Sequence, residues 1–364
     1  MILTHQRRLL RTRLQPWRLV ALAVVGICAS AGIIIVLLAR AAGPPAAFEA
    51  ESGTASGSAT VRSVVGSSGG SVATFGNVGE PDITVAIAGD IQKPTADLRY
   101  GLQTSDLIAQ TIMPNYVLAL GDLQYDSGTS SEFATYYSKS WGRAAIKNLT
   151  YPTPGNHEYN SNNAAPYFSY FAAANNLING KSVSGPAQLG YYAFDVGTNW
   201  RFYSMNSEAN TTEQTAWLVA DMAAHPKTCS LLFTHRPYWD FSTEHDGEAA
   251  STLPWLKAFY DNGGELVFTG HEHNYQRFVP VNPHTNQSDT ARGLRSFVVG
   301  TGGTTNLYNT FGSTVNNAQN LVAVSNGTTW GVLKLTLKPG NTYDWLFMPV
   351  NGASFTDSGS GTCH

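Results

Sequence analysis

Eight polar side chains that can bind metal ions or move protons lie just after short apolar runs of this chain. They are, in chain order, Asp90, Asp122, Tyr125, Asn156, His157, His235, His271 and His273. Carboxylate, imidazole, amide and phenolate groups are the donors that suit zinc, iron or manganese. Two such ions about 3.5–4 Å apart can hold the entering and leaving oxygens of a phosphoryl group. These residue types therefore predict a two-metal hydrolytic site.

Asp122 is the residue on which this prediction depends most. It follows residues 116–120, a short apolar run typical of a buried strand, and Gly121. Open α/β sheets keep their sites at the carboxyl ends of such strands. Asp122 has two carboxylate oxygens and could bridge two cations, and Tyr125 could reach one of them. A Gly-Asp pair alone is more often an ordinary turn, so the other residues must meet Asp122.

The spacing of three of these residues indicates parallel strands. Asp90, Asp122 and Asn156 are separated by 32 and 34 residues. A βαβ unit takes about thirty residues, so all three are expected at the ends of neighbouring parallel strands. The first two of these strands are predicted at residues 83–88 and 116–120.

The remaining elements predict the fold class. Helices are expected over 94–110, 130–147, 212–224 and 252–262, with Thr211 and Gln214 as a capping box for the third. A β-hairpin is expected over 190–206, and further strands at 229–234, 266–269, 296–300, 332–337 and 343–349. The pattern predicts an α/β domain over residues 81–350, a four-layer α/β/β/α sandwich of two packed, mainly mixed sheets flanked by helices. Residues 351–364 are left as a C-terminal tail.

The N-terminal region has the composition of a membrane signal-anchor. Residues 1–18 carry five arginines, and residues 19–38 are uncharged. About 20 apolar residues cross a bilayer, and the arginines predict a cytoplasmic N-terminus with the catalytic domain outside. The alternative is secretion after cleavage near Ala41, because Ala39-Arg40-Ala41 fits a signal cleavage site.

Residues 39–80 are rich in glycine and serine and are expected to form a linker with a possible β-hairpin. Within it, residues 48–53 resemble the first strands of carbohydrate-binding β-sandwich modules. This suggests cell-wall polysaccharide as a second partner. The match is far too short for a sandwich of about seven strands.

Charge and cysteine content narrow the partners and the compartment. The chain has 22 basic and 25 acidic residues, and six arginines lie in the first forty positions. The remainder carries a net charge of −9, which argues against a nucleic-acid partner. Cys229 and Cys363 either form a disulfide in an oxidising compartment or remain two free thiols, and the sequence leaves both open.

The motifs taken together resemble a known family. Their order is Gly-Asp, Gly-Asp-x-x-Tyr, Gly-Asn-His-Glu, His and Gly-His-x-His, which resembles the calcineurin-like metallophosphoesterases. The tyrosine at position 125 of the second motif resembles that of the purple acid phosphatase branch. Residues 300–303 and 355–359 resemble segments of the exported bacterial members of that branch. The resemblance covers about residues 83–350.

The resemblance implies two metal ions, one Fe(III) and the other Fe, Zn or Mn. The implied ligands of the first are Asp90, Asp122, Tyr125 and His273, and those of the second are Asp122, Asn156, His235 and His271. It also implies that His157 assists the leaving oxygen and that His245 faces the substrate. Gln92 departs from the family, where most members have a histidine ligand and the purple branch has glycine, and Tyr125 is expected to replace that ligand.

The implied activity is hydrolysis of small phosphate monoesters outside the cytoplasm by a metal-bound hydroxide. One alternative is a phosphodiesterase or nucleotide hydrolase that uses the same site. Another is a cell-wall-binding surface protein with an inactive metal site.

Overall fold

The structure is a computed structural model that describes residues 81–95, 98–172, 185 and 189–364, together with several short strands outside these ranges. The chain separates into two compact units, Met1–Glu80 and Pro81–His364. In the first unit, β1 (Ala47–Glu49), β2 (Thr60–Ser63) and β3 (Ser71–Thr74) form an antiparallel sheet in the order β1-β3-β2. The predicted membrane anchor, residues 19–38, lies outside the described residues. Among those described, no helix has the length and apolar character needed to cross a membrane.

The second unit contains a six-stranded sheet in the order β19-β18-β17-β4-β5-β6. Its strands β4 (Ile83–Ala88), β5 (Tyr116–Leu120) and β6 (Thr150–Thr153) are parallel, which confirms the arrangement predicted from their spacing. Its other strands, β17 (Gly331–Lys338), β18 (Thr342–Pro349) and β19 (Ser358–Thr362), are antiparallel to their neighbours.

The second sheet has eight strands. Its order is β14 (Gln287–Ser288), β13 (Tyr275–Asn282), β15 (Leu294–Val299), β12 (Leu266–Thr269), β11 (Cys229–Phe233), β10 (Trp200–Ser204) and β9 (Tyr192–Val196), and β16 (Val322–Asn326) pairs with β13. The strands β10, β11, β12 and β15 are mutually parallel, whereas the outer strands are antiparallel. Two short strands, β7 (Leu177–Ile178) and β8 (Lys181–Ser182), pair separately.

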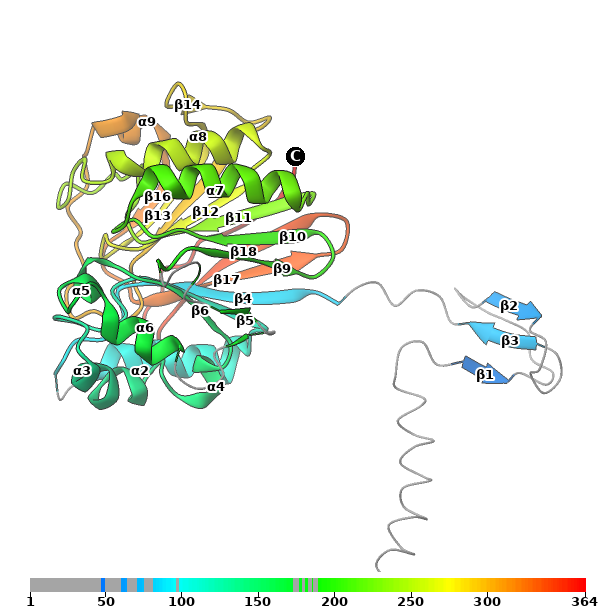
Figure 1. The fold of residues 1–364 in the computed structure, drawn as a ribbon, viewed down its shortest axis with the longest axis horizontal. Coiled ribbons are helices and arrows are strands. Elements are labelled where there is room, and N and C mark those ends of the chain that lie inside the picture. The colour runs from blue at the N-terminus through cyan, green and yellow to red at the C-terminus, as the bar shows by residue number, and fades with distance from the viewer. Residues whose placement is uncertain are drawn as a thin grey trace, which may run out of the picture. The chain divides into compact units, whose positions relative to one another are not determined.

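The two mixed sheets pack against each other between two layers of helices (Figure 1). The helices α7 (Thr211–Ala224) and α8 (Leu253–Asp261) cover the eight-stranded sheet, while α2 (Arg99–Asp106), α3 (Ser130–Thr135), α4 (Ala144–Lys147) and α6 (Ala165–Ala172) lie on the side of the six-stranded sheet. One buried cluster includes Leu118 and Leu335 of one sheet with Phe268 of the other. Burial of this apolar surface between the sheets is the main stabilising contribution to such a fold.

Two predicted helices differ from the observed ones. The helix expected over 94–110 begins at Arg99 and continues as a π-helix, η2 (Leu107–Ile112). The helix expected over 130–147 is divided into α3, η3 (Tyr137–Lys139) and α4. The Ser138 hydroxyl donates a hydrogen bond to the Phe133 carbonyl at 2.9 Å, which competes with regular helix bonding.

The predicted capping box at Thr211 is wrong. Asn210 is the N-cap of α7, because its side chain accepts a hydrogen bond from the Thr212 amide at 3.0 Å. Gln214 instead bonds the backbone of Asn206, from which it accepts at 2.8 Å and to which it donates at 2.9 Å. Its side chain is thus used to fix a loop. The other short helices are α5 (Asn156–Tyr159), η5 (Ala250–Thr252), η6 (Val315–Asn317) and α9 (Ala318–Leu321).

The C-terminal residues are part of the domain's structure. β19 pairs antiparallel with β18, and a disulfide joins Cys363 to Cys229 at the start of β11. Before β19, the carboxylate of Asp357 accepts hydrogen bonds from Arg277 at 2.7 and 3.0 Å and from the Tyr275 hydroxyl at 2.7 Å. Residues 351–364, predicted to be a tail, therefore include an edge strand of the six-stranded sheet, and Asp357 and Cys363 on either side of it contact the eight-stranded sheet.

Candidate metal centre

The predicted metal ligands lie at the carboxyl ends of strands from both sheets. Asp90, Asp122 and Asn156 follow β4, β5 and β6 of the six-stranded sheet. His235 follows β11, and His271 and His273 follow β12 of the eight-stranded sheet. Within each sheet these strands are parallel, so their carboxyl ends lie at one edge.

Three of these residues have an unusual backbone conformation. The φ angles of Asp90, Asp122 and His271 are 59°, 48° and 70°. Residues with a side chain rarely adopt the left-handed region, and strained backbone of this kind costs about 1–3 kcal/mol at each position. The conformation is held in part by backbone hydrogen bonds from Asp90 to Gly121 at 3.1 Å and from Ile91 to Asp122 at 2.9 Å. Such strain gathered at neighbouring polar residues indicates a functional site.

Glycines allow the loops to approach closely. Gly121 has a φ of 80°, and a Cβ there would lie 2.4 Å from Nδ1 of His235. A Cβ on Gly155 would lie 2.2 Å from Oδ1 of Asp122. The glycines of the Gly-Asp and Gly-Asn-His-Glu motifs therefore have a steric role at the site.

Asp90, Tyr125 and His273 form the first group of candidate ligands. The Tyr125 hydroxyl lies 2.8 Å from Oδ1 of Asp90 and 2.9 Å from Nε2 of His273. Nδ1 of His273 is 3.0 Å from the carbonyl oxygen of Asn306, which only an N–H can satisfy, so Nε2 of the neutral ring carries the lone pair. Burial, with the charges of Asp122 and Asp90, raises the pKa of Tyr125 well above its usual value. A cation bound here would favour the phenolate instead.

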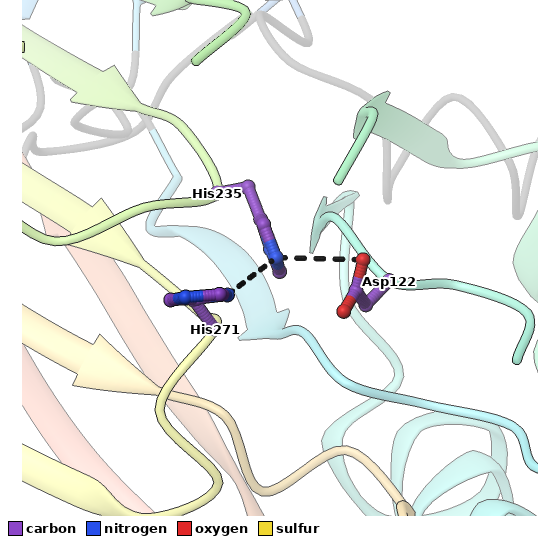
Figure 2. A group of neighbouring side chains, drawn as sticks. All are labelled: Asp122, His235 and His271. Atoms are coloured by element: carbon purple, nitrogen blue, oxygen red, sulfur yellow. Dashed lines mark hydrogen bonds and ion pairs between the residues drawn. The ribbon is translucent and has the colours of Figure 1, made fainter. Parts of the chain in front are cut away.

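Asp122, Asn156, His235 and His271 form the second group. Nδ1 of His235 lies 2.8 Å from the Leu120 carbonyl oxygen, which leaves the Nε2 lone pair of the neutral ring free. Around this Nε2 lie Oδ1 of Asn156 at 3.1 Å, Nδ1 of His271 at 3.2 Å and Oδ1 of Asp122 at 3.4 Å. Figure 2 shows His235 between Asp122 and His271. These four electron-rich atoms lie close together around one position, and such an arrangement suits a metal ion.

The charges in the second group are strongly linked. Burial alone raises the pKa of Asp122, but the imidazoles of His235 and His157 outweigh it and hold this pKa well below its usual value. In turn, the Asp122 carboxylate raises the pKa of His235 to about 10 despite its burial. Burial and the charges of His235 and Arg236 lower the pKa of His271, so its ring is neutral. Without metal, the proton on His235 stabilises the Asp122 carboxylate.

The two histidines predicted to face the substrate also lie at this site. The His157 amide donates to Oδ1 of Asp122 at 2.9 Å, and its Nε2 lies 3.7 Å from Oδ2. The His245 ring centre is 4.4 Å from that of His271, and its Nδ1 is 2.8 Å from Oε1 of Glu272. Their side chains are 28% and 30% exposed, so both can meet a molecule from solvent.

Gln92 takes no part in either group. It is buried, and its side-chain amide donates to the Lys93 carbonyl at 2.9 Å. The Tyr125 hydroxyl lies within hydrogen-bond distance of Asp90 and His273, and its role as a replacement for the missing histidine ligand stays a prediction.

Glu158 and Arg236 also lie at the site, although their sequence positions alone predicted no role for them. Glu158 accepts hydrogen bonds from the backbone amides of Leu123, Gln124 and Gly155 at 2.9, 3.1 and 2.8 Å, and so joins the loops after β5 and β6. The sequence feature that could have pointed to Glu158 is its place as the last residue of the Gly-Asn-His-Glu motif.

Arg236 lies beside the second group and contacts Glu208 at 2.8 Å and Glu248, as well as Nε2 of His271 at 3.1 Å. Glu248 itself lies 3.2 Å from the same His271 nitrogen. No sequence pattern links these residues, because Glu208 and Glu248 come from separate loops.

The pattern of strand ends and side chains agrees with comparison to known proteins. The family model described as calcineurin-like phosphoesterase matches residues 83–275, more than half of the chain. The chain belongs to this family. Both groups of candidate ligands lie within the matched segment.

Related sequences include purple acid phosphatases. Purple acid phosphatase 15 of Arabidopsis thaliana is 28% identical over 229 residues, which are 53% of this chain and 40% of that protein. An uncharacterised protein of Mycobacterium tuberculosis strain H37Rv is 24% identical over 278 residues, 64% of this chain and 47% of that protein. The chain thus spans less than half the length of each of these relatives.

Solved structures share the fold. Purple acid phosphatase PPD1 from yellow lupin seeds superposes with a TM-score of 0.60 at 17% identity, covering 82% of this chain and 58% of that one. GAP50, the anchor in the inner membrane complex of Plasmodium, gives a TM-score of 0.53 at 12% identity, covering 76% of this chain and 88% of that one. Both likenesses support the two-sheet architecture.

Proposed function

We propose that this protein hydrolyses phosphate monoesters at a site that binds two metal ions. The observation that carries the proposal is the convergence at Nε2 of His235, where atoms of Asp122, Asn156 and His271 lie within 3.4 Å. Hydrogen bonds alone satisfy this arrangement poorly, because one ring N–H donates well to one acceptor. Membership in the calcineurin-like phosphoesterases supports the same reading.

We assign the two groups of side chains to the two ions. Asp90, Tyr125 and His273 would hold the first ion, Asn156, His235 and His271 the second, and the Asp122 carboxylate would bridge them. The phenolate of Tyr125 favours Fe(III) for the first ion, and the nitrogen-rich second group suits Fe, Zn or Mn.

Bound cations would acidify a water molecule and neutralise the phosphate charge. The chain's own residues supply orientation and proton transfer. Glu158 fixes the loops that carry Asp122 and Asn156 through its three backbone contacts. His157, partly exposed beside Asp122, would donate a proton or hydrogen bond to the leaving oxygen. His245 would contact the substrate from the His271 side.

The proposal includes a location outside the cytoplasm, either anchored at the membrane or released. The disulfide between Cys229 and Cys363 supports it, since structural disulfides persist in oxidising compartments.

The proposal is tested with p-nitrophenyl phosphate and the purified, metal-loaded protein. Wild type should hydrolyse this monoester, and Asn156→Ala should reduce the rate about 100-fold or more, because it removes a metal ligand. The matched control is Asn262→Ala, an exposed asparagine at the end of α8, which should keep the wild-type rate. Equal rates in wild type and Asn156→Ala would contradict the assignment.

Bis-p-nitrophenyl phosphate separates monoester from diester hydrolysis at the same site. The proposal predicts a larger kcat/KM for the monoester. Faster hydrolysis of the diester would favour a phosphodiesterase with the same metal centre.

A further inference from the structure

An acidic cavity lies directly beside the candidate metal centre. Its walls include His271 of the second ligand group and His245. Four carboxylates line it, namely Asp240, Asp246, Glu248 and Glu272. The cavity is partly open, and the space available to the centre of a group the size of a water molecule is about 10 Å³, enough for one such group. Tyr238 contributes an aromatic wall. A small cation is therefore the chemical match for this space.

Two carboxylates of the cavity are buried with an unused oxygen. Glu272 is fully buried and Asp240 is 7% exposed. Oε2 of Glu272 and Oδ2 of Asp240 have no hydrogen-bond partner among the described residues. The other oxygen of each carboxyl has partners. Oε1 of Glu272 lies 2.8 Å from Nδ1 of His245. Oδ1 of Asp240 accepts hydrogen bonds from the Gln276 side chain at 2.7 Å and from the Ser242 amide at 2.8 Å. Buried polar atoms without a partner are costly, so a hydrogen-bond donor that enters the cavity would stabilise these two carboxyl groups.

The cavity has more negative than positive charge. Arg236 pairs with Glu248, and His245 pairs with Glu272. Within the described part of the chain, Asp240 bonds only uncharged groups, and Asp246 accepts from the Ser313 hydroxyl. Burial and the charge of Glu272 raise the pKa of Asp240 to about 8, so this carboxyl becomes a carboxylate above that pH or when a cation binds beside it.

We propose that this cavity receives the primary ammonium group of a phosphorylated amino alcohol whose phosphate binds at the metal centre. The inference rests on the proposed function and names its substrate class. His271 and His245 border both spaces, so one small molecule can occupy the two together. Hydrolysis joins a water oxygen to phosphorus and breaks the ester P–O bond. The alcohol oxygen takes the proton, and the products are phosphate and the amino alcohol.

Three esters of similar size test the proposal at pH 9, where Asp240, with a pKa of about 8, is a carboxylate and a primary ammonium group is still charged. Phosphoethanolamine carries an ammonium group, n-propyl phosphate ends in a methyl group, and phosphoglycolate ends in a carboxylate. The kcat/KM of phosphoethanolamine should exceed that of n-propyl phosphate about tenfold, and phosphoglycolate should be the poorest substrate. Equal values for the three esters, with p-nitrophenyl phosphate still hydrolysed, would overturn this inference and leave the proposed function standing.

Two variants test whether the cavity carboxylates cause the preference for phosphoethanolamine over n-propyl phosphate. Asp240→Asn and the exposed rim variant Asp246→Asn should each lower the ratio of phosphoethanolamine to n-propyl phosphate kcat/KM several-fold. Asp261→Asn, a matched exposed change where α8 ends, should leave the ratio unchanged. The rim variant alone decides the matter if Asp240→Asn does not fold. An unaltered ratio in Asp246→Asn and in any folded Asp240→Asn would refute the assignment.

Two further outcomes are informative. If added potassium or calcium chloride raises the rates of all three esters equally, a free cation fills the cavity and the proposal is overturned. If no ester, including p-nitrophenyl phosphate, is hydrolysed by the metal-loaded protein, the proposed function falls and this inference falls with it.

Discussion

Each of the three histidines in the candidate ligand groups has one ring nitrogen fixed by a neighbour and the other directed to the site. His235 and His273 use Nδ1 for the carbonyls of Leu120 and Asn306. Nε2 of His271 lies 3.2 Å from the Glu248 carboxylate and 3.1 Å from Nη1 of Arg236, and donation from Nε2 to Glu248 is the arrangement that leaves the Nδ1 lone pair for a metal. This outer contact sets which nitrogen is available to a metal and orients the ring.

The raised pKa of His235 predicts that metal binding releases a proton. This pKa is about 10, so at pH 7 the metal-free imidazole is protonated, whereas a ligating nitrogen must be free. The apparent metal affinity should therefore rise with pH below 10, about tenfold per pH unit for one proton. Calorimetric titration at pH 7 in buffers of different ionisation enthalpy measures the number of protons released. A heat that does not depend on the buffer would contradict the prediction.

Tyr125 predicts a spectroscopic signature. Its hydroxyl lies between Asp90 and His273, so an iron(III) ion bound by these residues would also bind the phenolate. The iron-loaded protein should show a visible absorption band, and Tyr125→Phe should lose it. The control is Tyr260→Phe, at a tyrosine near the end of α8 whose hydroxyl bonds Asp289 and no candidate ligand. Retention of the band in an iron-loaded Tyr125→Phe protein would exclude this tyrosine as a ligand.

At the scale of elements, the site depends on parallel strands that end at one edge of each sheet. The disulfide joins the opposite end of one such strand, Cys229 at the start of β11, to Cys363 after β19. It closes a segment of 134 residues, which restricts the unfolded chain.

Removal of this disulfide should destabilise the protein and leave the metal centre intact. Cys229→Ser with Cys363→Ser should lower the free energy of unfolding by about 2–4 kcal/mol, measured by urea denaturation. Metal content should be unchanged, because His235 lies beyond the other end of β11. Wild type in reductant should resemble the variant, and an unchanged urea midpoint in both would argue against a stabilising disulfide.

The strands that carry the site could be predicted from sequence because local patterns determine them. The apolar runs before Asp90 and Asp122 predicted the bounds of β4 and β5, and the spacing of the two aspartates predicted that these strands are parallel. The strand β19 could not be predicted, because its sequence Ser-Gly-Ser-Gly-Thr has little strand propensity and it pairs through β18. Arg236 and Glu248 were missed for a similar reason, since they meet His271 only through tertiary contacts.

On the scale of the whole molecule, residues 81–364 bring side chains from two sheets to one place. Asp122 of one sheet lies 3.4 Å from His235 of the other, and the His271 amide donates to Asp90 across the same boundary at 2.9 Å. The packing of the two sheets therefore determines the site, and neither sheet alone holds a full ligand set. The proposed metal centre therefore requires both sheets to be folded and packed together.

Anomalous X-ray scattering from crystals of the metal-loaded protein would locate the metal ions and show which side chains hold them. Two peaks about 3.5–4 Å apart are predicted, one beside Asp90, Tyr125 and His273 and the other beside Asn156, His235 and His271. The Asp122 carboxylate should lie within bonding distance of both. A single peak, or peaks that Asp122 does not bridge, would contradict the account.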